Sequence, residues 1–537
     1  MSGTGSKEHR SAGRAGSGPR WQTSAPTSFA ELIDHWASSR PDELAVTDGQ
    51  QRLSWQQLAD STGRLATALG GLGLSGGDRI AIQAPTSIDF VLTYLASLQA
   101  GLVVVPVNPA YTLPELDHIL ADSGAKLLVT GAVASIEAAG ELTGRHSGPH
   151  GAALQLVVAG RSGPDELPTV QSLLAGSSGR TAGPGRTGDD LAVLLYTSGT
   201  SGRPKGAMLP VRALLANLHQ VAQLQPAVAA PDDRLFLPLP LFHIFGLNAG
   251  LGMALYFGAG LVLSARFDAE GTLQSMADAK ATIVVGAPLE YARWAEQEGL
   301  AAGFEHVRFA LSGSAPLSAG LVGRFGELGV DLFEGYGLTE AAPVVTLNLM
   351  SADGEDGWAD PKPGSVGRPL PGVEVRLMDA DREPAETGDL GFVEVRGDNL
   401  FTGYWPDGEG GPDAEGWFST GDLAVTDDDG DLYLVGRRSD LVLVNGFNVY
   451  PAEVEAVFSS LAGVREAAVL GLPDAGGDDV LVAYVVPEPG AHPDPDELLA
   501  QAGRSLARFK LPRRIIEVDT LPHTVTGKVM KWRLKDG

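Results

Sequence analysis

The sequence contains no cysteine among its 537 residues. This absence excludes disulfides, thiolate nucleophiles, iron–sulfur clusters and cysteine-based zinc sites. Basic side chains are also scarce, because 39 Lys and Arg stand against 66 Asp and Glu, which gives a formal net charge of −27. Duplex nucleic acids are bound mainly by neutralising their phosphates with Lys and Arg, so this balance argues against a nucleic-acid-binding protein. Small anionic ligands stay open, since they respond to local charge more than to net charge.

Long uninterrupted apolar runs are missing as well. The two candidate stretches, 90–107 and 247–263, contain polar residues, glycine or proline. Each therefore predicts a buried helix followed by a buried strand and not a membrane span. Residues 1–26 are rich in Ser, Gly and Arg and lack the apolar core of a secretory signal, so we expect a disordered tail. These features favour a cytoplasmic protein without integral membrane contact.

The residues that are present indicate an α/β protein of more than one domain, since 537 residues exceed what one hydrophobic core usually supports. Short apolar runs alternate with amphipathic stretches, which predicts a large body with mainly parallel, buried strands at 79–82, 102–107, 126–129, 191–196 and 282–285. Alternating strands from about residue 364 predict a small β-rich subdomain. After Gly436 the pattern becomes mixed, with helices expected at 452–461 and 496–507 and strands at 467–470 and 480–486.

Two motifs mislead when they are read alone. Residues 71–76 match the glycine fingerprint of dinucleotide-binding folds, but they follow a predicted helix and precede a predicted strand, which is the reverse of the required order. Residues 427–431 resemble the start of a calcium-binding loop, but the bidentate Glu at position twelve and the flanking helices are absent. We therefore expect a hairpin turn at 427–431.

The segment after the predicted strand 191–196 has the composition of a phosphate-binding loop. It reads Thr197-Ser-Gly-Thr-Ser-Gly-Arg-Pro-Lys205-Gly206. Small hydroxyl residues and glycines allow several backbone amides to converge on an anion, and Lys205 adds a positive charge. No Gly-Lys-Ser/Thr triplet opens a helix here, so the loop is not a Walker A motif.

This loop, read from Tyr196 to Gly206, resembles the signature of the ATP-dependent adenylate-forming superfamily of acyl-CoA synthetases, peptide-synthetase adenylation domains and beetle luciferases. Five further matches follow in the order that the superfamily shows: 313–317, 336–340, 416–422, 436–437 and 526–528. The resemblance implies an N-terminal domain with the ATP and acyl sites at 27–436, a hinge at 437–440, and a small, mobile α+β C-terminal domain at 441–537.

The resemblance also implies a reaction in which ATP activates a carboxylate as an acyl-adenylate and CoA then displaces AMP. The ATP phosphates would be bound by Thr197, Ser198, Gly199, Thr200, Ser201, Gly202, Lys205 and Thr339. Adenine would lie between Tyr336-Gly337 and the backbone of Gly313, Ser314 and Ala315. The ribose would be bound by Asp422 and Arg437, and Mg²⁺ by Glu340 with Thr200.

Lys528 is the residue that the resemblance implies for catalysis, between the substrate carboxylate and the α-phosphate. Gly446 and Phe447 lie in a segment that resembles the loop facing the pantetheine arm of CoA. The sequence departs from the family at two places. Ser439 stands in the hinge where relatives usually carry Asp or Lys, and His523 stands where relatives commonly carry Arg.

Residues 239–246 resemble the segment that closes the acyl site. The resemblance implies that His243 gates this site, and we count it among the expected catalytic residues. Phe242, His243 and Phe245 favour an apolar acid over an amino acid, because amino-acid-activating relatives carry an Asp near this point. The small residues Gly335, Ala341 and Ala342 leave volume for the acyl group. Medium- or long-chain fatty acids come first as substrates, with aryl or cinnamic-type acids close behind.

Two alternatives stay open at this stage. The first is an acyl-adenylate ligase that loads a carrier protein, and the second is a non-catalytic homologue that binds nucleotide or acyl-adenylate. We expect small-molecule partners (the acid, ATP and CoA) and a monomer or homodimer. The charge is also uneven, since residues 501–537 hold nine basic and three acidic side chains, a net charge of +6. That basic segment predicts contact with anionic substrates.

Overall fold

The computed structural model describes residues 25–146, 154–160, 167–179, 185–197, 204–349, 362–444, 447–473, 479–524 and 527–535. The chain divides into two compact units, Met1–Glu374 with Arg396–Phe418, and Val375–Val395 with Ser419–Gly537. In the described ranges, no helix has the length and apolar character needed to cross a membrane. The expected tail lies almost wholly outside the described residues.

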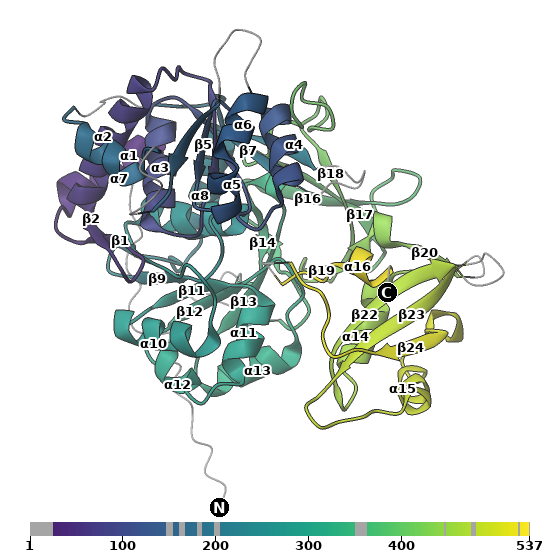
Figure 1. The fold of residues 1–537 in the computed structure, drawn as a ribbon. Helices are drawn as coiled ribbons and strands as arrows, with labels where there is room; N and C mark the ends of the chain where they lie inside the picture. The colour runs from purple at the N-terminus through teal and green to yellow at the C-terminus, as the bar shows by residue number, and fades with distance from the viewer. Residues whose placement is uncertain are drawn as a thin grey trace, which may run out of the picture. The chain divides into compact units, whose positions relative to one another are not determined.

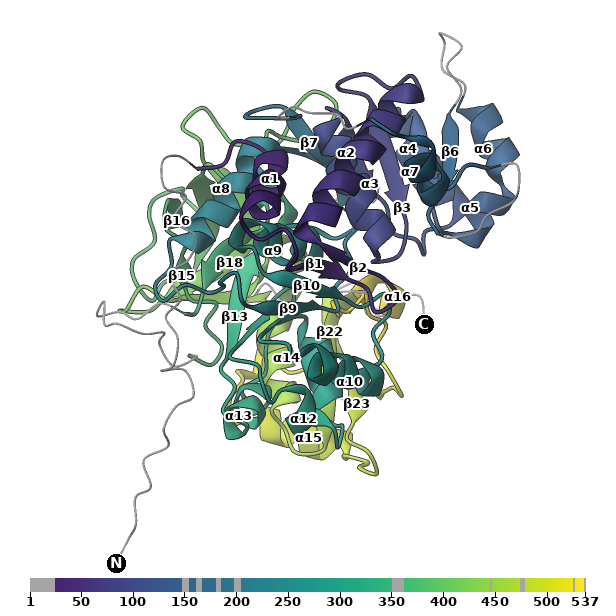
Figure 2. The same ribbon diagram turned by 90° about the vertical axis from the view of Figure 1, so that its left-hand side faces the viewer.

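The first unit contains a six-stranded sheet whose strands are parallel except for the last pair, β7 and β8. Its order is β6 (Gln155–Val158), β5 (Leu127–Thr130), β3 (Arg79–Gln83), β4 (Val103–Pro106), β7 (Leu191–Thr197) and β8 (Lys205–Pro210). The accompanying helices are α1 (Phe29–Ser39), α2 (Trp55–Gly71), α3 (Ile88–Gln99), α4 (Leu113–Ser123), α5 (Val133–Glu137), α6 (Ala139–Arg145), α7 (Val170–Gly176) and α8 (Val211–Ala222). Helices α1, α2 and α3 pack side by side (Figures 1 and 2). The predicted parallel α/β body is confirmed.

The second sheet of this unit has nine strands, in the order β15 (Arg368–Pro369), β14 (Val344–Leu347), β13 (Leu332–Gly337), β12 (Phe309–Ser312), β11 (Ile283–Gly286), β9 (Arg234–Leu237), β10 (Gly260–Leu263), β1 (Leu44–Thr47) and β2 (Arg52–Ser54). Strands from β13 to β1 are parallel, and the ends of the sheet are antiparallel. Its covering helices are α10 (Ala269–Ala279), α11 (Pro288–Ala295), α12 (Leu300–Gly303) and α13 (Ala319–Glu327).

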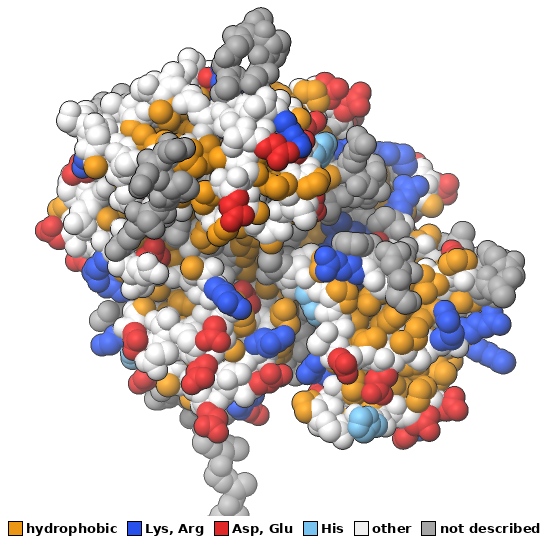
Figure 3. Space-filling model, viewed as in Figure 1, with side chains coloured by type: hydrophobic (Ala, Val, Ile, Leu, Met, Phe, Trp, Pro, Cys, Tyr) orange, Lys and Arg blue, Asp and Glu red, His pale blue; other side chains and the backbone are white. Residues whose placement is uncertain are grey.

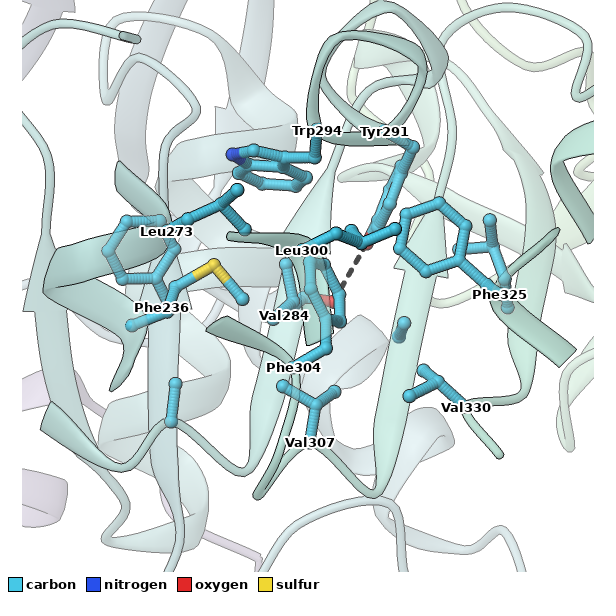
Figure 4. Packing of buried hydrophobic residues seen from close by; sticks show 14 of the residues in the cluster. Phe236, Leu273, Val284, Tyr291, Trp294, Leu300, Phe304, Val307, Phe325 and Val330 are labelled. Carbon is cyan, nitrogen blue, oxygen red and sulfur yellow. Dashed lines mark hydrogen bonds between the residues drawn. The ribbon is translucent and has the colours of Figure 1, made fainter. Parts of the chain in front are cut away.

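An aromatic core joins these helices to the nine-stranded sheet (Figure 4). Tyr291 and Trp294 from α11 pack edge to face at 5.4 Å between ring centroids. Phe325 from α13 meets Tyr291 at the same distance and an interplanar angle of 90°. The Tyr291 hydroxyl donates to the carbonyl of Val284 at 3.2 Å, which satisfies its polar end inside the core.

The apolar stretch 247–263 forms a buried helix, a glycine turn and a buried strand, as expected. Its first part is a π-helix, Phe245–Gly252, which continues into α9 (Met253–Phe257) and ends at Gly258 with φ 74°. The π geometry was not expected. Glycines allow it to approach its neighbours closely: a Cβ at Gly246 would lie 2.4 Å from the carbonyl oxygen of Pro240.

The second unit is rich in strands. Most of the four-stranded sheet β16 (Val373–Met378), β17 (Gly391–Gly397), β18 (Phe418–Thr426) and β19 (Leu432–Arg437) belongs to it. It continues through β20 (Val442–Val444), β21 (Phe447–Val449), β22 (Val464–Pro473), β23 (Asp479–Pro487) and β24 (Arg514–Glu517), with helices α14 (Pro451–Ser459), α15 (Pro495–Ala502) and α16 (Lys531–Lys535). The expected boundary and hinge after Gly436 stay predictions, because the compact units group most of the four-stranded sheet with the C-terminal sheet.

Both misleading motifs have the structure that their contexts predicted. Residues 71–76 begin at the last residue of α2 and precede β3. Residues 427–431 form the turn of the β18–β19 hairpin, where Asp427 Oδ1 accepts the backbone N–H groups of Asp429 and Asp431 at 3.1 and 2.9 Å. The expected hairpin turn is therefore confirmed.

Candidate active site

The phosphate loop spans the gap between two paired strands. Thr197 at the end of β7 and Lys205 at the start of β8 are partners in the antiparallel register. Ser198, Gly199, Thr200, Ser201 and Gly202 lie outside the described residues. A Cβ at Gly206 would lie 2.7 Å from Leu194 Cδ1, so any other residue would have to displace that side chain where the loop rejoins the sheet. The register brings Thr197 and Lys205 to the same end of the β7–β8 pair.

Glu340 is the expected magnesium ligand. Its Oε1 accepts a hydrogen bond from the Tyr404 hydroxyl at 2.5 Å. Within the described part of the chain, its Oε2 accepts no hydrogen bond. A carboxylate oxygen that is not engaged by protein donors suits Mg²⁺, which takes one or two carboxylates and its other ligands from phosphate and water. The sequence patterns did not indicate Tyr404.

The expected adenine-binding residues lie on neighbouring parallel strands. Gly313 follows β12, and Tyr336 lies on β13, whose residues pair in register with β12. Tyr336 is buried, and Ser314 adopts a left-handed φ of 76°. A Cβ at Gly337 would lie 2.1 Å from the carbonyl oxygen of Pro343, so only glycine can occupy this position. The strands therefore bring the two motifs together, with Ala315 two residues beyond Gly313.

The expected acyl segment meets this adenine region directly. A Cβ at Gly313 would lie 3.1 Å from Cζ of Phe245, so the phenyl ring packs against the Gly313 backbone. Ala341 and Ala342 are fully buried beyond Glu340. Gly335 also makes room for a neighbouring strand, because a Cβ at this position would lie 2.7 Å from Leu347 Cδ2 on β14.

Three buried asparagines hold the segment that carries Thr339 and Glu340. Asn399 Nδ2 donates to the carbonyl of Ala341 at 2.9 Å, and Asn248 Nδ2 donates to that of Ala342 at 2.7 Å. Asn217 bonds both backbone groups of Val344, at 2.7 and 3.1 Å. Sequence patterns did not reveal these asparagines, because their partners lie 58, 94 and 127 residues away.

His243 is neutral at physiological pH. Its protein surroundings lower its pKa to about 4, because burial penalises the charged imidazolium. The backbone N–H of Phe245 donates to Nδ1 at 3.3 Å, which places the ring proton on Nε2. His243 can therefore donate a hydrogen bond from Nε2 but carries no charge toward a substrate carboxylate.

In the second unit, Asp422 and Arg437 are cross-strand partners on β18 and β19. Arg437 Nε lies 2.8 Å from Asp422 Oδ1, and Asp422 is 5% exposed. Burial lowers the pKa of Lys528, and the positive charge of Arg437 lowers it further, while Asp440 and Asp422 oppose the shift. The Lys528 side chain is nevertheless exposed to solvent, which screens its interactions with these charges. The expected ribose and catalytic residues thus share one electrostatic environment.

The segment that carries Lys528 is tied to the C-terminal sheet by side-chain contacts. His523 Nε2 lies 2.5 Å from Glu466 Oε1. The histidine that stands where relatives commonly carry Arg therefore has an acidic partner. Lys531 pairs with Glu455 at 2.7 Å, and the Tyr484 hydroxyl donates to the carbonyl of Leu534 at 2.8 Å. The side chains of Ser439 and Phe447, and all of Gly446, lie outside the description.

Comparisons with known proteins identify the family of this chain. Residues 33–405 match the AMP-binding enzyme family, and residues 453–528 match the AMP-binding enzyme C-terminal domain. The chain is 34% identical over 516 residues to a feruloyl-CoA synthase from Amycolatopsis sp, covering 93% of this chain and 96% of that protein. It is 33% identical over 536 residues to a long-chain-fatty-acid–CoA ligase from Salmonella typhimurium, covering 95% and 94%.

The fold is also similar to solved structures. The ATP-bound crystal structure of MatB from Rhodopseudomonas palustris superposes with a TM-score of 0.83 at 34% identity, covering 94% of this chain and 98% of that one. The resemblance to adenylate-forming enzymes and the predicted α/β fold class are thereby confirmed. The chain belongs to the AMP-binding enzyme family, within its group of acyl- and aryl-CoA ligases, which join an acid to a thiol and form AMP.

Proposed function

We propose that this chain is an ATP- and Mg²⁺-dependent carboxylate–CoA ligase that acts on an apolar acid of fatty or aryl type. The observation that carries the proposal is the packing of Phe245 against Gly313, because it brings the acyl segment next to the adenine-binding motif. An acyl group enclosed there would lie beside the nucleotide to which it is joined.

The first half-reaction joins a carboxylate oxygen to the α-phosphorus and releases pyrophosphate with the electron pair of the broken bond. Both reactants are anions, so the site needs fixed donors and positive charge around them. Lys205 and the loop amides would bind the outer phosphates, and Thr339 the α-phosphate. Mg²⁺ held by Glu340 and Thr200 would supply further positive charge to the phosphates. Lys528 would neutralise the carboxylate and the α-phosphate during attack.

In the second half-reaction, the CoA sulfur attacks the acyl carbon, AMP leaves, and the thiol proton passes to solvent. We propose that the C-terminal domain turns about 437–440 between the two steps, which withdraws Lys528 and presents Gly446 and Phe447 to CoA. This proposal rests on the family resemblance of these segments.

The nature of the acid follows from the polarity of the acyl segment. Phe245 and the buried residues Ala341 and Ala342 offer apolar contacts, and His243 is uncharged. Similar proteins are named for feruloyl and for long-chain fatty acyl groups, which are both apolar acids. Each buried methylene contributes about 0.8 kcal/mol, so a fatty-acid enzyme should show affinity that rises with chain length.

The test is a panel of fatty, benzoic and cinnamic acids with ATP and Mg²⁺, with and without CoA, and with amino acids as negative controls. Pyrophosphate and thioester are measured separately. We expect both products from at least one apolar acid and neither from the amino acids. Pyrophosphate without thioester would favour a ligase that loads a carrier protein, and neither product from any acid would favour a nucleotide-binding homologue.

A further inference from the structure

The carboxylate of Glu340 is bound by a tyrosine from a distant part of the chain. The Tyr404 hydroxyl donates to Glu340 Oε1 at 2.5 Å, across 64 residues of sequence. This distance lies in the range of charge-assisted O–H···O bonds, which are roughly twice as strong as bonds between neutral groups. The bond fixes one oxygen of a side chain that the resemblance gives to the metal.

The backbone around Tyr404 is held on both sides. The Phe401 N–H donates to the carbonyl of Glu340 at 2.8 Å, so the same segment also fixes the Glu340 main chain. On the other side, the Met208 N–H donates to Gly403 at 3.0 Å, and the Trp405 N–H donates to Gly206 at 2.8 Å. Residues 401–405 therefore connect Glu340 to β8, the strand that begins at Lys205.

The ring of Tyr404 also contacts the phosphate-loop lysine. Lys205 Nζ lies 5.6 Å from the Tyr404 ring centroid, within the range of a cation–π interaction. Phe401 packs against Tyr404 edge to face at 5.1 Å. One side chain thus touches the expected metal ligand through its hydroxyl and the expected phosphate-binding cation through its ring.

The neighbouring residue anchors the other side of the loop. Trp405 Nε1 donates to the carbonyl of Asp122 at 2.9 Å. The hydroxyl of Tyr196, which precedes the loop on β7, donates to Asp122 Oδ2 at 2.5 Å. Both ends of the phosphate loop are therefore linked to the segment that contains Tyr404.

We propose that Tyr404 is a positioning residue for metal-dependent adenylation. Its hydroxyl holds Glu340 Oε1 so that Oε2 serves the metal, and its ring keeps Lys205 nearby. The proposal rests on the magnesium role proposed for Glu340. A hydroxyl that orients a ligating carboxylate acts through the ligand, and removal of such an outer partner typically costs about 10- to 100-fold in metal affinity or activity.

The test is Tyr404→Phe in the full chain, because phenylalanine keeps the ring and removes the hydroxyl alone. We expect the Mg²⁺ concentration for half-maximal pyrophosphate release to rise at least about tenfold. Calorimetric binding of Mg·ATP to the free protein should weaken by a similar factor. ATP binding without metal, and thioester formation from supplied acyl-adenylate, should stay within about twofold of wild type, because Lys205 keeps its aromatic neighbour.

The matched control is Tyr433→Phe, which also removes one hydroxyl that bonds a carboxylate, here Asp427 at 3.1 Å in the β18–β19 hairpin. This variant should keep the wild-type Mg²⁺ dependence. An equal shift in both tyrosine variants would overturn the proposal, since it would report a general effect of losing a hydroxyl.

Glu340→Gln separates failure of this proposal from failure of the proposed function. If Glu340→Gln leaves the Mg²⁺ dependence unchanged, the metal assignment itself is wrong. If Glu340→Gln shifts it and Tyr404→Phe does not, the positioning role is overturned. The double variant Glu340→Gln/Tyr404→Phe should resemble Glu340→Gln alone, because the tyrosine acts through that carboxylate, and additive shifts would contradict the coupling.

Discussion

Glu290 is a single buried carboxyl group that links stability to pH. It is 6% exposed, its Oε2 accepts the Ala287 N–H at 2.8 Å, and burial raises its pKa to about 8. In the unfolded chain the carboxyl ionises near its ordinary value of 4.5, so between these values the folded protein holds a proton that the unfolded chain has released. Its contribution is fully present below 4.5 and is lost as pH rises through about 8.

We therefore predict that Glu290→Gln flattens the pH dependence of stability. The amide keeps an oxygen acceptor for the Ala287 N–H but cannot ionise. The thermal midpoint of the variant should therefore exceed that of wild type by more at pH 8 than at pH 5. Thermal midpoints of the full chain across this range measure the effect. Glu298→Gln, at an exposed position nearby, is the control. A constant difference between Glu290→Gln and wild type at all pH values would show that the carboxyl does not titrate as described.

Lys528 gives a prediction about which half-reaction fails. Lys528→Ala should reduce pyrophosphate release by about 10²–10³, the usual cost of removing one charge-stabilising donor. Thioester formation from supplied acyl-adenylate should stay near the wild-type rate, because the lysine is proposed to act only in the first step. Arg465→Ala, which removes an exposed positive charge from the same unit outside residues 501–537, should leave both rates unchanged. Equal losses in both half-reactions would contradict the role proposed for Lys528.

At the scale of elements, the π-helix Phe245–Gly252 depends on glycine at its first turn. A Cβ at Gly246 would lie 2.4 Å from the backbone oxygen of Pro240, which cannot rotate away as a side chain can. Gly246→Ala should therefore destabilise the protein by about 1–3 kcal/mol, as overpacking does. It should also raise the KM for the acid, since the same segment carries Phe245.

The contrast is Gly320→Ala on α13, where a Cβ would meet nothing within 4 Å. Alanine there should stabilise by about 0.4–1 kcal/mol through lower unfolded-state entropy and better helix propensity. Thermal unfolding of both variants measures the difference. Similar midpoints for Gly246→Ala and Gly320→Ala would contradict the close approach at Pro240.

Elements that depend on neighbours in sequence could be predicted. The hydrophobic pattern located β3, β4, β5, β7 and β11, and Ser54 with Gln57 forms a capping box at the start of α2, because those signals act over a few residues. The π-helix could not be separated from an α-helix, since all its residues are buried and its apolar pattern has no period. Tyr404 and the three asparagines could not be found, because their bonds cross long stretches of chain.

At the scale of the whole molecule, the acidic excess is spread and the basic excess is local. Acidic side chains are scattered over the face seen in Figure 3, which fits a solvated surface. Residues 501–537 carry +6 against −27 for the full chain. Arg508 and Arg513 are exposed, whereas Lys510 binds both oxygens of Glu453 at 2.6 and 2.7 Å. Lys510 therefore has an acidic partner within its own unit, and the two arginines expose their side chains to solvent.

We predict that Arg508→Gln/Arg513→Gln raises the apparent KM for CoA or ATP, and that the increase is larger at low salt. At about 0.01 M salt the Debye length is about 30 Å, so the arginines attract an anionic substrate from a distance, but at about 0.15 M it falls to about 8 Å. Adding Lys510→Gln should lower the thermal midpoint at every salt concentration, because it breaks the pair with Glu453. The control Arg266→Gln/Arg293→Gln makes the same charge change at exposed positions of the first unit. If both double variants change the KM equally, or if the effect does not depend on salt, the attraction comes from net charge or from direct contact, and the C-terminal segment has no steering role of its own.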